Sequence, residues 1–516
     1  GDKKGGGGGG AAGAGKEILG VTHKKEEDFS GWYNDVIYRA ELVSNYPVTG
    51  CFVVRPTAYA VWEHIQKFMD DEIKQRGVQN VYFPMFVTED ALTKEKDHVE
   101  GFSAEVAWIT RYGNSELGKA IALRPTSETV MYPFYSDWIS SFRDLPLKQN
   151  QWCNVVRWEF SSATPFIRTR EFLWQEGHTA WATREGAVAE VYDILDMYAR
   201  TYRDVLAVPV VKGVKTEKEK FAGGDFTTTV EAYAPVVGRG IQAGTSHHLG
   251  TNFAKMFNVR YTDDSGESQL CHQNSWGFST RSLGVMIMVH SDNKGLVLPP
   301  RVAPLHAVFV TIRFKNTDTD ALLAKCGELR DALRDAGVRA KVDTDTSKTP
   351  GFARTHWELR GVPLRIELGP RDVEKRAVLV CRRDTGAKES VPWTQLAVRV
   401  AQLLDDIHAT LYARALAERN AHVKRINAWA ELVPALDGRN IVLAPFCDTV
   451  ACEESIKKRS SEEAKQFVAD GGQGLTGAAK TLCKPLAGEL DDELMRLDAD
   501  AKCIGCDSKA AVVCLF

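Results

Sequence analysis

The sequence predicts an α+β protein of about three domains, led by a large antiparallel sheet flanked by helices. Three observations support this fold class. Segments between residues 151 and 279 have the pattern of neighbouring strands joined by short loops, which favours antiparallel pairing. Strands and helices alternate after residue 305, as in a partly parallel α/β sheet. The chain has 516 residues, enough for three domains of roughly 150 residues, and six of its 11 cysteines follow residue 440.

The composition excludes several classes of protein. Hydrophobic residues make up 44% and charged residues 26% of the chain, which is ordinary for a globular protein and unlike a coiled-coil rod. No apolar run approaches the roughly 20 residues that cross a bilayer, and no apolar segment follows the N-terminus. We therefore expect a soluble, cytosolic protein with no membrane partner. The net charge of −3 gives no sign of a nucleic-acid partner.

The first domain is expected to cover residues 19–304, after a flexible tail over residues 1–18. Residues 1–15 contain nine glycines and no large apolar side chain, so they cannot offset the entropy of ordering. A stripe of apolar side chains then predicts an amphipathic helix over residues 57–76. The segment VQNVYFPMFV follows as a strand interrupted by Pro84, which is typical of a sheet edge or bulge.

The middle of this domain is rich in predicted strands. QWCNVVRWEF (151–160) and REFLWQEGHTAWA (170–182) alternate with a period of two residues and predict a hairpin. An amphipathic helix is expected over residues 185–206, and a second one carries LGVMIMVHSDN. Further strands are expected near residues 226–234, 239–248 and 268–279.

The second domain is expected over residues 305–420 and the third over residues 421–516. Four segments have the pattern of strands: HAVFVTI, RAKVD, LRIEL and AVLVC. Three have the pattern of helices: residues 319–336, the segment that ends in HWELRG, and residues 393–416. Residues 306–400 hold 18 Lys+Arg and 13 Asp+Glu, a local excess of five positive charges in a chain of net charge −3. We expect an α/β domain, followed by a small α+β domain that carries the cysteine cluster.

One face of the predicted hairpin combines groups that suit ligand binding. These are Arg157 and Glu159 in the first strand and Phe172, Trp174, Glu176 and His178 in the second. The connecting loop brings Arg168 and Thr169 back toward this face. The simpler interpretation is a solvated face with cross-strand ion pairs, and for an isolated hairpin it would be preferred.

Three other segments favour a ligand site. They contribute Thr126 and Glu128 after a proline-initiated turn, Gln242, Thr245 and His247 among small residues, and Ser279 at a strand-to-helix junction. Arg281 lies in the first turn of the following helix, where a cation opposes the helix dipole. An anion such as a phosphate between the arginine and the helix end explains this position. The alternative is an arginine that pairs with a nearby carboxylate.

The C-terminal cysteines are spaced like metal ligands. Cys447 and Cys452 form one close pair in the sequence, and Cys503 and Cys506 form another. Two such pairs indicate a four-cysteine zinc site that staples a small domain. Cys483 and Cys514 are the alternatives to Cys506 as the fourth ligand, and free thiols are the alternative to a metal site.

The motifs together resemble the class II aminoacyl-tRNA synthetases. The segment over residues 57–86 is similar to motif 1, VVRWEF with RTREFLWQEGHTA to motif 2, and GFSTRSLGVMIMVHSDNKGLVLPPRVAP to motif 3. Within class IIa, RPTSE, RTREFLWQEGH, KTEKEKFAGGD, GTSHHLG and GLVLPPRVAP resemble the prolyl-tRNA synthetases of the eukaryotic and archaeal type. The resemblance extends from about residue 25 to the C-terminus.

The resemblance implies a cytoplasmic, homodimeric proline–tRNA ligase that uses ATP with Mg²⁺, L-proline and tRNA(Pro). Attack of an ionised carboxylate on the α-phosphorus needs positioning and positive charge but no general base. By resemblance, Arg157 bridges the α-phosphate and the proline carboxylate, and Arg281 stacks on adenine and contacts the γ-phosphate; both are expected to be catalytic. The other ATP contacts that the resemblance implies are Glu159, Arg168, Thr169, Phe172, Gln242, Thr245 and Ser279.

The resemblance also implies how proline and tRNA are bound. Thr126 and Glu128 would accept the hydrogens of the proline ammonium. The ring would be enclosed by Trp174, Glu176, His178 and His247. The second domain resembles an anticodon-binding domain, in which Glu358, Arg365 and Arg371 would read guanines of the anticodon.

Two further expectations concern editing and zinc. Motif 2 ends near residue 181 and motif 3 begins near residue 276, which leaves no space for the editing domain that bacterial-type relatives insert there. We therefore expect no hydrolysis of alanyl-tRNA(Pro) in cis. The eukaryotic relatives carry a four-cysteine zinc site similar to the one that the cysteine pairs indicate.

Two other functions fit these motifs less well. A threonyl or glycyl enzyme of class IIa shares motifs 1 to 3, but RPTSE with REFLWQEGH fits proline best. A synthetase-like protein that only binds tRNA or regulates other proteins would have no reason to keep Arg157, Arg168 and Arg281. Family members often end in Tyr, whereas this chain ends in Phe516, so no role is assigned to the terminal residue.

Overall fold

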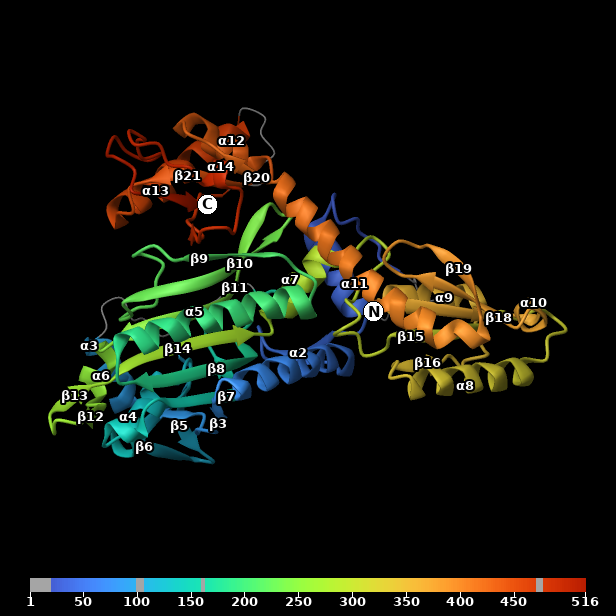
Figure 1. The fold of residues 1–516 in the computed structure, drawn as a ribbon, viewed down its shortest axis with the longest axis horizontal. Helices are drawn as coiled ribbons and strands as arrows, with labels where there is room; N and C mark the ends of the chain where they lie inside the picture. The colour runs from blue at the N-terminus through green and yellow to red at the C-terminus, as the bar shows by residue number, and fades with distance from the viewer. Residues whose placement is uncertain (1–19, 99–105, 159–162, 470–476) are drawn as a thin grey trace, which may run out of the picture.

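The structure, a computed structural model, describes residues 20–98, 106–158, 163–469 and 477–516. The expected tail over residues 1–18 lies outside these residues. Figure 1 shows a large sheet unit (elements from Phe29 to His290), an α/β unit at one end (elements from Ala307 to Pro392) and a C-terminal unit (elements from Val423 to Leu515) packed on the large sheet. The long helix α11 (Leu396–Ala421) leads from the α/β unit to the C-terminal unit.

The sheet unit is built on an eight-stranded sheet that is antiparallel except at one edge, where β3 pairs parallel to β7. In spatial order its strands are β22 (Lys484–Pro485), β9 (Val210–Val214), β10 (Phe226–Ala234), β11 (Arg239–Gly250), β14 (His272–Ser279), β8 (Glu171–Trp181), β7 (Leu147–Val156) and β3 (Gln79–Asn80). The predicted α+β class is therefore confirmed.

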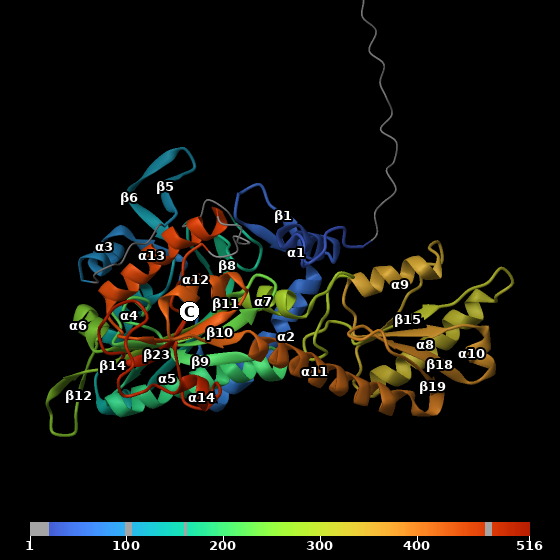
Figure 2. The same ribbon diagram turned by 90° about the horizontal axis from the view of Figure 1, so that it is seen from above.

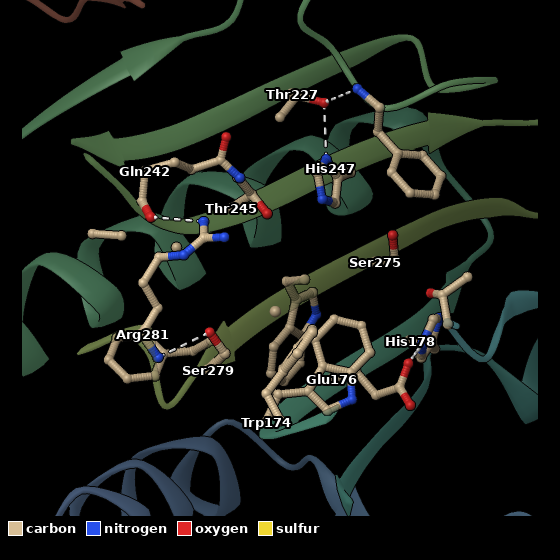
Figure 3. A pocket seen from close by; sticks show the side chains of 18 of the residues that line it. Trp174, Glu176, His178, Thr227, Gln242, Thr245, His247, Ser275, Ser279 and Arg281 are labelled. Carbon is tan, nitrogen blue, oxygen red and sulfur yellow. Dashed lines mark hydrogen bonds and ion pairs between the residues drawn. The ribbon is translucent and has the colours of Figure 1, made fainter. Parts of the chain in front are cut away.

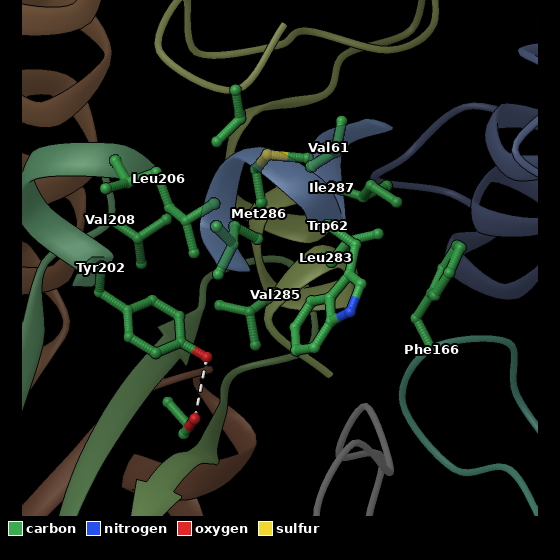
Figure 4. Packing of buried hydrophobic residues seen from close by; sticks show 14 of the residues in the cluster. Val61, Trp62, Phe166, Tyr202, Leu206, Val208, Leu283, Val285, Met286 and Ile287 are labelled. Carbon is green, nitrogen blue, oxygen red and sulfur yellow. Dashed lines mark hydrogen bonds between the residues drawn. The ribbon is translucent and has the colours of Figure 1, made fainter. Parts of the chain in front are cut away.

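Helices cover the large sheet and form its hydrophobic core. α5 (Arg184–Arg200) and the π-helical turn after it (Thr201–Val205) pack on β10, β11 and β14, as does α7 (Arg281–His290). α2 (Pro56–Gln75) places its apolar stripe against α7, and α1 (Phe29–Arg39) joins the same cluster. Figure 4 shows Trp62 of α2 beside Leu283 and Ile287 of α7 in this core, which fixes the helix that begins with Arg281.

Smaller elements frame the large sheet. β4 (Phe86–Thr88), β6 (Ser115–Leu123) and β5 (Trp108–Tyr112) form a three-stranded sheet beside α3 (Glu89–His98) and α4 (Glu128–Trp138). Two strand pairs and one short helix complete the unit. The pairs are β1 (Val43–Asn45) with β2 (Phe52–Val54) and β12 (Arg260–Thr262) with β13 (Ser268–Leu270), and the helix is α6 (Asn252–Phe257). Residues 182–271, all of which the structure describes, belong to this unit and include no inserted domain.

Three predicted strands were wrong in part. The strand expected over VQNVYFPMFV forms only at its ends, as β3 and β4, because Pro84 lacks an N–H and the chain leaves the large sheet there. The first hairpin strand ends at Val156, so Arg157 lies just beyond it. The strand expected over residues 268–279 is divided at Cys271 into β13 and β14.

The α/β unit has a five-stranded, partly parallel sheet, as predicted. Its order is β16 (Ala340–Val342), β15 (Ala307–Thr311), β17 (Leu364–Leu368), β18 (Ala377–Arg382) and β19 (Lys388–Pro392), with β16, β15 and β17 parallel. α8 (Thr319–Asp335), α9 (Pro350–Leu359) and α10 (Pro370–Glu374) connect these strands. The sequence did not predict β19, a polar edge strand.

The C-terminal unit is a small α+β fold. β20 (Val423–Arg425), β21 (Ile441–Phe446) and β23 (Val512–Leu515) form its sheet, with α12 (Leu432–Asp437), α13 (Val450–Ala469) and α14 (Asp492–Met495) around it. Its strand β22 joins the large sheet, which the sequence did not predict. In the turned view of Figure 2 this unit lies over β9 and β10. Among the described helices of the chain, none is long and apolar enough to cross a bilayer.

Candidate active site

A cavity of about 260 Å³ opens on the face of the large sheet opposite α5. Successive residues of β8 point to opposite faces. Gln175 accepts a hydrogen bond from Tyr198 of α5 on one face, whereas Trp174 and Glu176 line the cavity on the other. Figure 3 shows β14, with Ser275 and Ser279, between the side chains of β8 and those of β11.

The structure brings twelve of the predicted site residues to this one cavity. They are Thr126, Glu128, Arg157, Phe172, Trp174, Glu176, His178, Gln242, Thr245, His247, Ser279 and Arg281. Arg168 is exposed in the loop between β7 and β8, and Thr169 lines a neighbouring cavity of about 230 Å³. Glu159 lies outside the described residues. The cavity is also lined by Glu219, Phe221, Thr227 and Trp276, which sequence reasoning missed.

One end of the cavity is acidic. Thr126 donates a hydrogen bond to the Glu128 carboxylate, and both residues stand at the start of α4. Glu128 is buried, and its carboxylate lines the cavity beside the Glu176–His178 pair. Two carboxylates beside a hydroxyl can hold a cationic ammonium group by charge-assisted hydrogen bonds.

Glu176 and His178 form a buried ion pair, with 3.0 Å between Oε2 and Nε2. Burial alone would raise the pKa of Glu176, but the bond to His178 and those from Ser127 and Gln151 hold it below its ordinary value. Burial opposes the charge on His178, yet Glu176 and the charge of Glu128 raise its pKa above the usual value. Each partner thus favours the charged form of the other, and Nδ1 of the imidazole lies 3.0 Å from the Tyr132 hydroxyl.

His247 is held as a neutral wall of the cavity. Its Nδ1 lies 2.8 Å from Oγ1 of Thr227, which accepts the Phe221 amide at 2.8 Å. The Phe221 ring packs on the imidazole with 4.8 Å between ring centroids. Burial, together with the nearby charges of His178 and Lys215, lowers the pKa of His247 to about 3. A neutral ring against an aromatic one suits an apolar part of a ligand.

The other end of the cavity is cationic. Nε of Arg157 donates to the Pro125 carbonyl at 2.9 Å, and its guanidinium lies 5.5 and 5.4 Å from the centroids of Phe172 and Trp174. Arg281 is the first residue of α7, as predicted, and donates to the carbonyls of Ile167 and Gln242 at 3.2 and 3.3 Å.

Neither arginine forms an ion pair with a carboxylate in the described part of the chain. Burial lowers the pKa of Arg281, and the nearby charge of Arg157 adds to this effect. The alternative of an Arg281–carboxylate pair is therefore not what the structure shows. Two cations that contact only carbonyls and aromatic faces leave N–H groups for an anionic ligand.

The three residues predicted to read the anticodon do not form one cluster. Glu358 precedes β17 and Arg371 follows it, so they lie at opposite ends of that strand. The Glu358 carboxylate accepts from Lys294 of the sheet unit at 3.2 Å. Within β17, Nε of Arg365 donates to Glu367 at 2.9 Å, and Arg371 is exposed at the start of α10.

Four cysteines of the C-terminal unit converge, as the spacing predicted. The Sγ atoms of Cys447, Cys452, Cys503 and Cys506 all lie within 4.8 Å of one another. Two of these separations are 3.6 Å, between Cys452 and Cys503, and 3.8 Å, between Cys506 and Cys447. Cys483 and Cys514, the alternative ligands, lie outside this group; Cys514 contacts the Cys483 carbonyl instead.

Three known protein families match separate parts of the chain. Residues 108–290 match the tRNA synthetase class II core domain (G, H, P, S and T), residues 306–403 the anticodon binding domain, and residues 429–516 the C-terminal domain of prolyl-tRNA synthetase. These matches coincide with the cavity, the α/β unit and the cysteine cluster.

Individual relatives are similar over most of their length. A putative proline–tRNA ligase of Schizosaccharomyces pombe is 50% identical over 511 residues, 97% of this chain and 71% of the relative. The cytoplasmic proline–tRNA ligase of Arabidopsis thaliana is 50% identical over 90% of this chain and 86% of its own. The crystal structure of prolyl-tRNA synthetase from Cryptosporidium parvum, complexed with halofuginone and AMPPNP, aligns with a TM-score of 0.90 at 47% identity, covering 96% and 99% of the two chains.

Proposed function

The chain belongs to the prolyl-tRNA synthetase family, and we propose that its cavity performs both steps of proline–tRNA ligation. In the first step a carboxylate oxygen of L-proline attacks the α-phosphorus of ATP, and pyrophosphate leaves with the electrons of the broken P–O bond. In the second step the terminal hydroxyl of tRNA(Pro) attacks the prolyl carbonyl, and AMP leaves. The observation that carries this proposal is one cavity with a carboxylate end for an ammonium and an arginine end for phosphates.

The arginine end is assigned to ATP. Arg157 would bridge the α-phosphate and the proline carboxylate, while Arg281 would contact adenine and the γ-phosphate. Both would act by positioning the reactants and neutralising charge that develops on phosphate oxygens. The wall toward Arg281 is completed by Phe172, Gln242, Thr245 and Ser279, with Arg168, Thr169 and Glu159 proposed as further ATP contacts. Mg²⁺ would enter as part of the ATP complex.

The acidic end is assigned to L-proline. Thr126 and Glu128 would accept the two ammonium hydrogens, and Glu176 would keep His178 in place. Trp174 and the neutral His247 would enclose the ring. Because a missing methylene changes binding by only about 1–3 kcal/mol, this pocket alone would admit alanine. With no inserted domain in residues 182–271, the enzyme should leave alanyl-tRNA(Pro) intact.

The α/β unit is assigned to the anticodon of tRNA(Pro). Its local positive charge suits a polyanion, and arginine can bind a guanine edge by two hydrogen bonds. We propose Glu358, Arg365 and Arg371 as the contacts, with Arg371 exposed for this purpose. Glu358 would have to exchange its bond with Lys294 for one with a base.

The cysteine cluster is assigned to structural zinc. Tetrahedral zinc with Zn–S bonds of about 2.3 Å separates its sulfurs by about 3.8 Å. The separations of 3.6 and 3.8 Å within the cluster fit this geometry. Zinc held there by Cys447, Cys452, Cys503 and Cys506 would stabilise the C-terminal unit.

We propose that the protein is a homodimer, which the surface around the motif 1 segment supports, and that it is cytoplasmic like its relative from Arabidopsis thaliana. Five large apolar side chains of this region are exposed: Tyr82, Phe86, Trp108, Phe134 and Trp138. Exposed apolar patches are typical of protein interfaces, and motif 1 resembles a two-fold interface. Sedimentation analysis should give the mass of a dimer, and a monomer at micromolar concentration would contradict this assignment.

One experiment separates this function from its alternatives. Exchange of pyrophosphate into ATP is measured in the presence of each of the twenty amino acids in turn. We expect exchange that depends on proline. A stronger signal with threonine or glycine, or none with any amino acid, would refute the proposal. For the anticodon, Arg371→Ala should weaken tRNA charging and leave proline-dependent exchange intact.

A further inference from the structure

The C-terminal unit is joined to the large sheet at β9. The loop that follows β9 in the chain forms one wall of the cavity. In β22, Lys484 pairs with Val214 and Pro485 with Gly213 of β9, and the Leu486 amide donates to the Lys212 carbonyl at 2.9 Å. The two chain segments are more than 250 residues apart, yet they form adjacent strands of one sheet. The contact is therefore part of the fold of the sheet unit.

Two glycines allow this close approach. A Cβ atom on Gly213 would lie 2.4 Å from Sγ of Cys483, and one on Gly240 would lie 2.2 Å from a methyl carbon of Leu482. Both distances are shorter than a real Cβ contact. A Cβ on Gly213 would also lie 2.8 Å from the backbone carbonyl of Lys484, so the backbone of the C-terminal unit is seated directly on that of β9, whereas at Gly240 the contact is with the Leu482 side chain.

A buried lysine ties the two units together. Nζ of Lys215 lies 2.6 Å from a carboxylate oxygen of Glu231 in β10 and 2.7 Å from the carbonyl of Leu482 in the C-terminal unit. The side chains of Lys215 and Glu231 are 4% and 2% exposed. A charge that is buried this deeply needs all of its partners, so Lys215 is fixed by the C-terminal unit as well as by its own.

The loop that follows Lys215, residues 216–225, forms a wall of the cavity. Its Glu219 and Phe221 line the cavity, and Phe221 packs on His247. From the C-terminal unit, Nζ of Lys480 pairs with Glu219 at 2.8 Å, and Glu454 pairs with Lys218 at 3.4 Å. The loop is therefore held between the sheet and the C-terminal unit.

We infer that the C-terminal unit positions the proline end of the active site. Lys480 acts through Glu219, and the Leu482 carbonyl acts through Lys215. Both contacts hold the loop whose Phe221 packs on His247. This inference rests on the proposed function of the cavity. The contacts reach the amino-acid end through the loop, whereas Arg157 and Arg281 are held by carbonyls of the sheet unit. Lys480 and Lys215 are positioning residues, and their loss should act on proline rather than on ATP.

The test uses the full chain and separates the two Michaelis constants in proline-dependent ATP–pyrophosphate exchange. Lys480→Glu should raise KM for proline by about tenfold and change KM for ATP by less than about twofold, because a positioning contact for one substrate is lost. Lys480→Arg keeps the pair with Glu219 and should behave like the parent. Lys458→Glu is the matched control, because Lys458 is an exposed lysine of the same unit that forms no ion pair among the described residues.

A second variant and a second measurement extend the test to the loop itself. Lys215→Met should shift KM for proline in the same direction. Hydrogen exchange of residues 216–225 should quicken in Lys480→Glu and Lys215→Met, but not in Lys458→Glu.

If KM for proline stays at the parental value in Lys480→Glu, or if both Michaelis constants rise together, the inference is wrong. It is also wrong if Lys480→Glu leaves hydrogen exchange of residues 216–225 unchanged. Absence of proline-dependent exchange in the parent chain would instead refute the proposed function itself.

Discussion

Replacing Arg281 with methionine should separate catalysis from stability. This arginine contributes little to the free energy of folding. It donates two long hydrogen bonds, 3.2 and 3.3 Å, to backbone carbonyls, each worth about 1 kcal/mol. Against these stand the helix dipole of α7, which disfavours a cation at its first residue by about 0.3–1 kcal/mol, and the charge of Arg157. Methionine also buries its apolar chain more readily.

These terms offset one another in part, so the free energy of unfolding of Arg281→Met should lie within about 2 kcal/mol of the parental value. Its effect on the reaction should be far larger. An arginine that stabilises charge on transferring phosphoryl oxygens contributes about 10³-fold to the rate, so kcat/KM for proline-dependent exchange should fall by about that factor.

The assays are denaturant unfolding and ATP–pyrophosphate exchange, with Arg260→Met as the matched control. Arg260 is exposed in β12 and bonds only to Asn258 among the described residues, so its loss should change neither quantity. A destabilisation of more than about 3 kcal/mol would show that Arg281 supports the core, in the range of a buried charge pair. Exchange above a tenth of the parental rate would show that it does not bind phosphate.

Three other predictions concern pH, the cysteines and the packing beneath the cavity. Burial lowers the pKa of His290 to about 3, so the neutral imidazole is favoured in the folded state. The free energy of unfolding is therefore highest above pH 6.5 and falls as the pH drops toward 3. In thermal or denaturant unfolding, His290→Gln should reduce that loss by about 1.4 kcal/mol per pH unit below 6.5. Cys506→Ser should lower the zinc content measured by mass spectrometry and destabilise the C-terminal unit, whereas Cys483→Ser should keep its zinc; the reverse result would exchange the ligand assignment. A Cβ on Gly177 would lie 2.2 Å from the Trp276 ring. Gly177→Ala should therefore lower the free energy of unfolding by about 1–3 kcal/mol and raise KM for proline. If neither quantity changes, the ring can move aside.

The parts of the site that the sequence predicted are those set by local periodicity. Alternation along residues 170–182 placed Trp174, Glu176 and His178 on one face of β8, and the structure has them lining the cavity together. The position of Arg281 at the start of a helix followed equally from local pattern. A period of two or 3.6 residues fixes which side chains share a face wherever the element lies in the fold.

The parts that the sequence did not predict depend on segments that meet only in the folded chain. In the sequence, nothing distinguishes Phe221 from other apolar residues of a charged loop. In the structure it lines the cavity, because its amide bonds to Thr227 and its ring packs on His247. The addition of β22 to the large sheet could not be predicted from a two-residue strand. Short elements of this kind carry no periodicity, so their pairing is decided by tertiary contacts.

The arginines show what a sequence leaves undetermined about charged side chains. Arg365, which resemblance assigns to the anticodon, shares the buried carboxylate of Glu367 with Arg354. Arg157 and Arg281 contact carbonyls and aromatic faces, without a carboxylate partner in the described part of the chain. An arginine that neutralises a buried carboxylate stabilises the fold, because its removal leaves that charge unpaired. An arginine that contacts only carbonyls has no carboxylate partner, so it can bind an anionic ligand. Loss of Arg365 should therefore destabilise the α/β unit as well as weaken tRNA binding, while loss of the exposed Arg371 should affect binding alone.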